Sequence, residues 1–210
     1  MSESEDKAKI LSAMGGVKGL IDSGLPALLF LIAFNITKDV RDSAYAALAL
    51  SLLQTLVRLV KRETIQHALS GVIGVGICAG LSLITGNAID FYRPGLWING
   101  IYGSVYLISI LLRWPVIGLI IGPLLEENFR WRKDPARTKV YIRATWLWVG
   151  MFAIKLVVQY PLYVSGNINS LGIARLIMGY PLTFAIAWAT WLVIKKGPKL
   201  RDDLRIDKAS

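Results

Sequence analysis

Two basic side chains lie inside long apolar stretches of this sequence, where a charge needs compensation. Lys155 is near the middle of the run formed by residues 143–164, and Arg175 lies about one helical turn inside the run that follows. A charged side chain deep in hydrocarbon costs about 2.5–3.5 kcal/mol on insertion scales, so a counter-charge, a polar cavity or a ligand must compensate it. The chemistry open to two such cations is the binding of an anionic solute or lipid head group.

Uncharged polar residues fall at similar depths. Gln159 lies one helical turn from Lys155 on the same face, and Asn99 in another run lies at about the depth of Arg175. We expect these four residues to form a ligand-binding layer in the outer half of the membrane. The layer contains no carboxylate, and Asp90 in a nearby loop is the nearest counter-ion that the sequence offers. An anion or a water-filled cavity between the two cations is therefore predicted, with a purely structural pairing of Lys155 as an equal alternative.

A second polar group is expected near the inner surface. Asp22, Gln54 and Arg58 reach similar depths in the first two apolar runs, and one hypothesis is that Asp22 and Arg58 form a pair. The favoured alternative is that Asp22 stays near the interface while Arg58 extends to lipid phosphates.

Proline lies inside three of the apolar runs, and each proline removes one backbone donor. We expect helix kinks at Pro26, Pro161 and Pro181. The carbonyls that they free could bind a cation, but simple packing kinks are the favoured reading, because neighbouring helices and water readily satisfy such groups.

Enzyme chemistry has little support in this sequence. His67 is the only histidine and Cys78 the only cysteine, which excludes a His-pair zinc site and any multi-cysteine metal site. There is also no paired-carboxylate motif in the apolar runs. We therefore expect no catalytic residue, no bound metal and no cofactor.

The elements that must position these residues are membrane helices. The chain is 54% hydrophobic with a mean hydropathy of +0.51, and apolar runs of spanning length, about 17–25 residues, recur along it. Only helices satisfy all their backbone groups within such a segment. The predicted fold is therefore an all-α bundle of six transmembrane helices, at residues 19–36, 44–60, 65–85, 94–112, 140–164 and 171–194.

The distribution of charge orients this bundle. With the N-terminus inside, Lys and Arg concentrate on the cytoplasmic side, and the outer segments carry only Lys38, Arg41 and Arg93. Both termini are thus predicted to be cytoplasmic, with a polar tail at 1–14, a single membrane domain at 15–194 and a basic tail at 195–210. Residues 115–125 are apolar but too short to span, so we expect an interfacial or re-entrant piece.

The net charge of +10 is explained by this orientation without nucleic acid. The expected partners are membrane lipids, with anionic lipid at the basic cytoplasmic surface. In the third run, Gly76 and Gly80 form a GxxxG pair, which serves internal packing or a homodimer.

Six ordered stretches carry a resemblance to a known family. They are GGVKGLIDSGLP (15–26), LVKRETIQHALSGVIGV (59–75), RWPVIG (113–118), WRKDP (131–135), VQYPLYV (158–164) and LGIARLIMGYPL (171–182). Over residues 15–194 the chain resembles an actinobacterial family of uncharacterised integral membrane proteins, domain of unknown function 3159 (DUF3159). The resemblance implies an arginine where this chain has Lys155. The first four runs are also distantly similar to the inner-membrane septation-protein family, whose members are tied to envelope synthesis and division.

These observations predict a multi-pass protein of the bacterial inner membrane. The favoured function is a small transporter- or channel-like protein with a cationic intramembrane site for an anionic solute or lipid head group. The alternative is a non-catalytic scaffold for envelope or cell-division assembly, in which the charges lock helices together.

Overall fold

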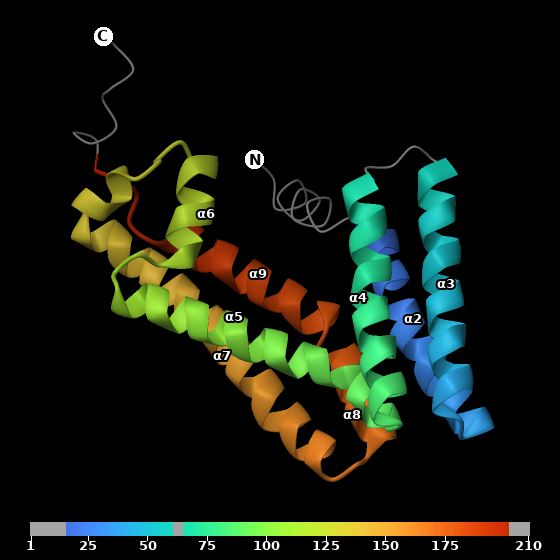
Figure 1. Ribbon diagram of the computed structural model, residues 1–210. Helices are drawn as coiled ribbons and strands as arrows, with labels where there is room; N and C mark the ends of the chain where they lie inside the picture. The colour runs from blue at the N-terminus through green and yellow to red at the C-terminus, as the bar shows by residue number, and fades with distance from the viewer. Residues whose placement is uncertain (1–15, 61–64, 202–210) are drawn as a thin grey trace. The chain divides into compact units, whose positions relative to one another are not determined.

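The structure, a computed structural model, describes residues 16–60 and 65–201, and the side chains of residues 24–60 and 71–201 (Figure 1). All regular elements in these ranges are helices, which confirms the predicted all-α class. The described residues form two compact units. The first holds the chain up to Ile98 together with Val157–Tyr180, and the second holds Asn99–Leu156 and the chain from Pro181 onward.

Three long helices dominate the first unit (Figure 1), and the second of them in the sequence packs against both of the others. They are α2 (Gly16–Thr37), α3 (Val40–Val60) and α4 (Ile65–Thr85). The short 3-10 helix η1 (Ala88–Tyr92) follows and packs on α4. The turn before α3 and the turn after α4 have clear causes. Asp39 Oδ1 accepts the first backbone N–H groups of α3, and Gly86 takes the left-handed conformation after α4.

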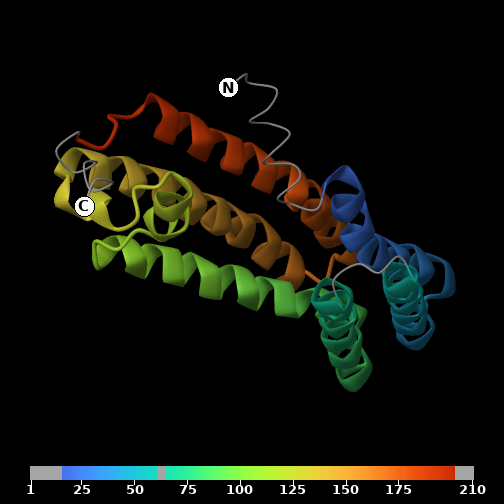
Figure 2. The same cartoon turned by 90° about the horizontal axis from the view of Figure 1, so that it is seen from above.

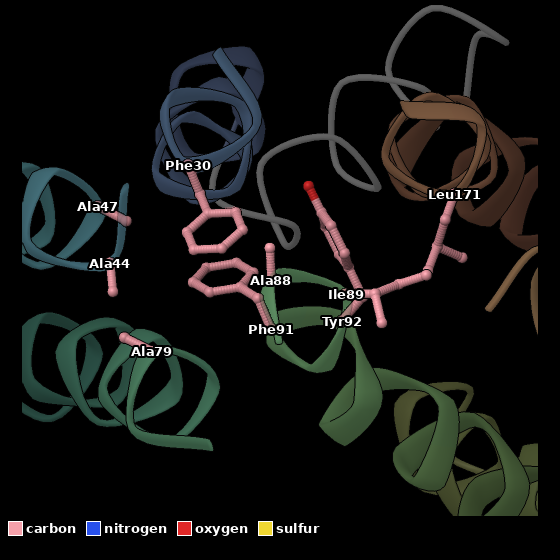
Figure 3. Close-up of a cluster of buried hydrophobic side chains, with 9 residues drawn as sticks. All are labelled: Phe30, Ala44, Ala47, Ala79, Ala88, Ile89, Phe91, Tyr92 and Leu171. Carbon is pink, nitrogen blue, oxygen red and sulfur yellow. The ribbon is translucent and has the colours of Figure 1, made fainter. Parts of the chain in front are cut away.

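The core of the first unit is aromatic on one side and built from small residues on the other (Figure 3). The rings of Phe30 and Phe91 stack with their centroids 4.0 Å apart, and Tyr92 meets Phe30 edge-on at 6.3 Å. Alanines 44, 47 and 79 on α3 and α4 are fully buried, so these helices approach closely. Leu171 of α8 (Ile168–Ile177) completes the cluster next to η1.

The second unit contains most of α5 (Arg93–Leu111), most of α7 (Pro135–Val164) and α9 (Tyr180–Lys196). These helices run alongside one another in Figure 2. Side chains of α7 bridge them: Trp148 stacks on Tyr106 of α5, with centroids 5.8 Å apart, and its Nε1 donates to Thr190 Oγ1 of α9 at 2.9 Å. Gly103 lets α5 approach Phe152 of α7, where an added Cβ would be 3.2 Å from the Phe152 Cβ.

Four helical segments are long and apolar enough to cross a membrane: Val40–Val60, Ala88–Leu111, Pro135–Val164 and Ile168–Lys196. Shorter apolar helical segments lie at Gly24–Thr37 and Gly71–Thr85. The chain is therefore a multi-pass membrane protein. The stretch near 115–125 forms α6 (Val116–Leu124), whose nine residues reach only about 14 Å, too short to span.

The last predicted span differs from the expectation of one continuous helix over 171–194. It is interrupted after Ile177, and α9 begins at Tyr180. Pro181 explains the break, because it has no N–H to donate and its ring crowds the carbonyl of Ile177 four residues earlier. It therefore stands at the second position of α9, where the missing donor is tolerated. The other two prolines, Pro26 and Pro161, lie inside α2 and α7.

Candidate functional site

Arg175 lies in the last turn of α8 and is held against η1 in the first unit. Its Nη1 donates to the backbone carbonyl of Tyr92 at 2.7 Å, and its guanidinium carbon lies 5.5 Å from the centroid of the Tyr92 ring. The Tyr92 side chain is itself fixed, since it is 1% exposed and its hydroxyl donates to the carbonyl of Ala27 on α2 at 3.4 Å. Tyr92 thus connects α2 with α8 at the point where the arginine sits.

Two glycines create the space for this contact. A Cβ at Gly95, in the first turn of α5, would overlap the guanidinium of Arg175. A Cβ at Gly172 on α8 would lie 3.1 Å from the Tyr92 hydroxyl and 2.7 Å from Leu31. The close approach of α8 to η1 and α5 therefore depends on the absence of side chains at both positions.

The charge of Arg175 meets only neutral groups in the part of the chain that the structure describes. The carboxylate expected to be nearest, Asp90, instead accepts a short hydrogen bond from the Tyr163 hydroxyl and lies 3.9 Å from Arg93 Nη1. Asp90 is 6% exposed, and the Tyr163 hydroxyl and the Arg93 guanidinium compensate the cost of burying its carboxylate. Arg175 has four further N–H donors beyond the one that binds Tyr92.

Lys155 of α7 is nearly buried in the second unit. Its Nζ donates to Thr183 Oγ1 on α9 at 3.3 Å and lies 6.0 Å from the centroid of the Phe152 ring. Thr183 was not singled out by the sequence, since a lone threonine in an apolar helix usually bonds its own backbone. Here it ties the charge of α7 to α9.

The predicted outer layer is divided between the two units. Lys155 and Asn99 belong to the second, whereas Arg175 and Gln159, a buried residue, belong to the first. The complete layer of four residues stays a prediction.

The predicted inner pair is only partly described. Asp22 lies outside the residues whose side chains the structure describes, as does His67. Gln54 and Arg58 are half-buried one turn apart on α3. Pairing of Asp22 with Arg58 stays a prediction.

A buried ionic network in the second unit was missed from the sequence. Glu127 and Arg137 form a two-pronged ion pair, with Nε to Oε2 at 2.9 Å and Nη2 to Oε1 at 2.7 Å. The hydroxyl of Tyr141 also donates to Glu127 Oε2 at 2.7 Å. All three side chains are buried, so the carboxylate is compensated by two good donors.

The same arginine holds the end of α9. Arg137 Nη1 donates at 3.3 Å to the carbonyl of Ile194, one of the groups that the end of α9 leaves unsatisfied, and at 3.1 Å to the carbonyl of Pro198 just beyond the helix. Asp134 accepts the N–H groups of Ala136 and Arg137 at the start of α7, and its other oxygen accepts the N–H of Arg201. The first part of the basic tail is thereby fastened to the unit.

A cavity of about 600 Å³ opens beside this network. It is reached where the chain turns sharply after α6, with Glu126 and Asn128 in the left-handed conformation. Its polar lining comes from Glu126, Glu127, Asn128 and Arg130. No group of three His, Cys, Asp or Glu side chains that could hold a metal occurs among the described residues.

The comparison that decides the family covers nearly the whole chain. Residues 14–201 match the family described as "Protein of unknown function (DUF3159)". The chain belongs to the DUF3159 family. Comparisons with curated proteins and with solved structures give no match.

In this DUF3159 protein, two of the stretches that carried the resemblance supply residues with the structural roles described above. WRKDP supplies Trp131, which is fully buried, and Asp134, which caps α7. LGIARLIMGYPL supplies Arg175 and the helix break. A signal for the missed network existed: Arg137 and Tyr141 are spaced i, i+4 on one helix face, with an acidic residue ten positions earlier.

Proposed function

We propose that this DUF3159 protein is a small transporter- or channel-like protein of the bacterial cell membrane that binds an anionic group at Arg175. The observation that carries the proposal is the hydrogen bond from Arg175 to a neutral carbonyl, with no carboxylate partner among the described residues. A guanidinium in an apolar segment that is compensated only by dipoles favours a bound anion. Its remaining donors suit the oxygens of a phosphate or a carboxylate.

The helix break next to this arginine supports the same function. Arg175 lies two residues before the end of α8, and α9 starts three residues after that end. Interrupted membrane helices recur at the substrate sites of secondary transporters, because their exposed ends offer backbone dipoles to a solute. Gln159 belongs to the same unit as Arg175, and we propose it as a further contributor to the site. For Lys155 and Asn99, a role in ligand binding is proposed from the sequence alone.

We propose six crossings with both termini in the cytoplasm. Besides the four long apolar segments, we count α2 and α4 as the other two crossings. Their 22 and 21 residues each correspond to about 32 Å of helix. That length matches the hydrocarbon core of a bilayer. The concentration of Lys and Arg on one side then sets the orientation.

The test is anion binding by the purified protein. Isothermal titration in detergent with phosphate, a short-chain carboxylate and chloride should show saturable binding of an oxyanion by wild type. Arg175→Met should abolish that binding while a melting curve shows a folded protein. Absence of saturable binding for the whole panel would count against the proposal.

A second function is favoured by a different observation. Arg175 and Arg137 both bind backbone carbonyls of other helices, so charge in this protein also locks elements together. That suits a non-catalytic scaffold for envelope or division assembly, with a homodimer as one form. We propose no enzymatic activity, no cofactor and no nucleic-acid partner under either function. The scaffold would be favoured if cross-linking in cells recovered a defined complex and the purified protein bound none of the anions in the titration.

A further inference from the structure

The short helix α6 has two apolar faces, and only one of them is covered. The covered face packs on Trp131 of η2 (Arg130–Lys133) and contains the buried residues Ile117, Gly118 and Gly122. An added Cβ would lie 2.9 Å from the Trp131 indole at Gly118 and 2.7 Å from it at Gly122. On the other face, Ile120 is 51% exposed and Leu124 is 72% exposed. The helix is thus seated firmly on its own unit and presents bulky aliphatic side chains outward.

Two aromatic residues extend this exposed apolar surface. Trp114 precedes α6 and Phe129 follows it, and their rings contact each other with centroids 6.3 Å apart. They are 40% and 58% exposed. The turn that carries Trp114 is fixed, because its N–H donates to the Ser109 carbonyl at 2.8 Å. We call Trp114, Ile120, Leu124 and Phe129 the α6 patch.

Basic side chains border the α6 patch. The guanidinium of Arg132 lies 3.6 Å from the centroid of the Trp114 ring, which holds it in place by a cation–π contact. Arg113, which directly precedes Trp114, and Lys133, which directly follows Arg132, are also exposed. Two of the acidic residues nearby, Glu127 and Asp134, are buried in the network that Arg137 and the start of α7 form, whereas Glu126 is exposed just after α6.

We infer that the α6 patch lies in the head-group layer of the membrane and that Arg132, held on Trp114, binds the phosphate of anionic phospholipids. A helix of nine residues cannot span, and exposed aliphatic groups between aromatic and basic residues are what an interfacial helix requires. The positive charge complements anionic lipid rather than a second apolar protein face. This inference does not depend on an anion at Arg175; only its assignment to the cytoplasmic leaflet rests on the proposed topology.

The experiment places a fluorescent probe on the α6 patch of the full chain. In a Cys78→Ser background, Leu124→Cys is labelled with an environment-sensitive dye, and the protein is reconstituted in nanodiscs of phosphatidylcholine with or without phosphatidylglycerol. Lys199→Cys, an exposed polar position, is the matched control. Lipids that carry a spin label on the acyl chain should quench the probe at 124 and leave the probe at 199 almost unchanged, whereas aqueous iodide should do the reverse.

The lipid preference is measured on the same particles. Quenching at 124 by spin-labelled phosphatidylglycerol should exceed quenching by spin-labelled phosphatidylcholine, and Arg132→Gln should reduce that preference about fivefold. Lys199→Gln should leave the preference unchanged, and melting curves confirm that each variant is folded. A probe at 124 that iodide quenches as strongly as the probe at 199 would overturn the inference and leave the α6 patch to a protein partner. Equal quenching by both lipids, unaffected by Arg132→Gln, would overturn the assignment of anionic lipid.

Discussion

Arg175 contacts Tyr92 in two ways: it donates to the backbone carbonyl of Tyr92 and lies beside the ring of the same residue. Because Tyr92 also bonds to α2 through its hydroxyl, the position of the arginine is fixed by groups on three helical elements. Neutral dipoles stabilise a charge but do not cancel it, so the positive potential around Arg175 remains and attracts an anion.

The first prediction concerns the glycine under the guanidinium. Gly95→Ala should displace the guanidinium of Arg175, because the new Cβ would occupy its position, and the lost hydrogen bond to the Tyr92 carbonyl should cost about 1.5–3 kcal/mol. Gly100→Ala on the same helix is the matched control, since a Cβ there meets nothing within 4 Å, and alanine should stabilise the helix by up to about 1 kcal/mol. Thermal melting in one detergent compares the two. Equal melting temperatures would show that Arg175 does not need the space at Gly95.

The second prediction concerns the lysine of α7. Thr183→Val removes an acceptor of a nearly buried ammonium group and should cost about 1.5–3 kcal/mol. Lys155→Met should also destabilise, but the double variant should lose less than the sum of the single losses, because the charge that needs Thr183 is gone. Unfolding midpoints of the four proteins test this coupling. Strict additivity would mean that the hydrogen bond contributes nothing.

The third prediction concerns the buried ion pair. Arg137→Met should cost about 3–5 kcal/mol, because it leaves the Glu127 carboxylate buried without its main partner. Replacing both residues, with Glu127→Leu added, should restore much of the stability, since the uncompensated charge disappears. Lys139→Met, at an exposed position of α7, is the control and should change stability by less than about 0.5 kcal/mol. Unfolding in mixed micelles provides the measurement, and a double variant as unstable as Arg137→Met would refute the explanation.

The fourth prediction concerns the seat of α6. Gly122→Ala would bring a Cβ to 2.7 Å from Trp131 Nε1 and from the Asn128 carbonyl, so α6 must shift at a cost of about 1–3 kcal/mol. Gly150→Ala in α7 meets nothing within 4 Å and serves as the control. Protease sensitivity between residues 112 and 131 should rise only in the first variant. An unchanged digestion pattern would mean that α6 adapts without moving.

Composition and periodicity predicted the helical membrane class and the short, non-spanning segment correctly, because both follow from the lengths of apolar runs. The break between α8 and α9 was harder. Pro181 was recognised, but a proline inside an apolar run can either kink a helix or open a new one, and the sequence does not distinguish these outcomes.

The partner of Arg175 could not be predicted at all. A backbone carbonyl has no signature in the sequence, and the relevant one belongs to Tyr92, 83 residues away. The pairing of Glu127 with Arg137 could not be predicted for a different reason: both residues lie in a polar, largely basic segment of the sequence, and their burial depends on how α6 and η2 fold onto α7. Charge counts describe a loop's average environment and miss a buried pair.

The central claim is that Arg175 binds an anion, and the most direct measurement is the uptake of radiolabelled phosphate and acetate into liposomes that contain the purified protein. Wild type should take up one of these anions above the level of empty liposomes, Arg175→Lys should retain part of the uptake through its charge, and a folded Arg175→Met should lose it. Gly100→Ala should behave as wild type. If folded Arg175→Met takes up the anion as wild type does, or if none of the proteins exceeds empty liposomes, the arginine is a structural lock and the transport function is wrong.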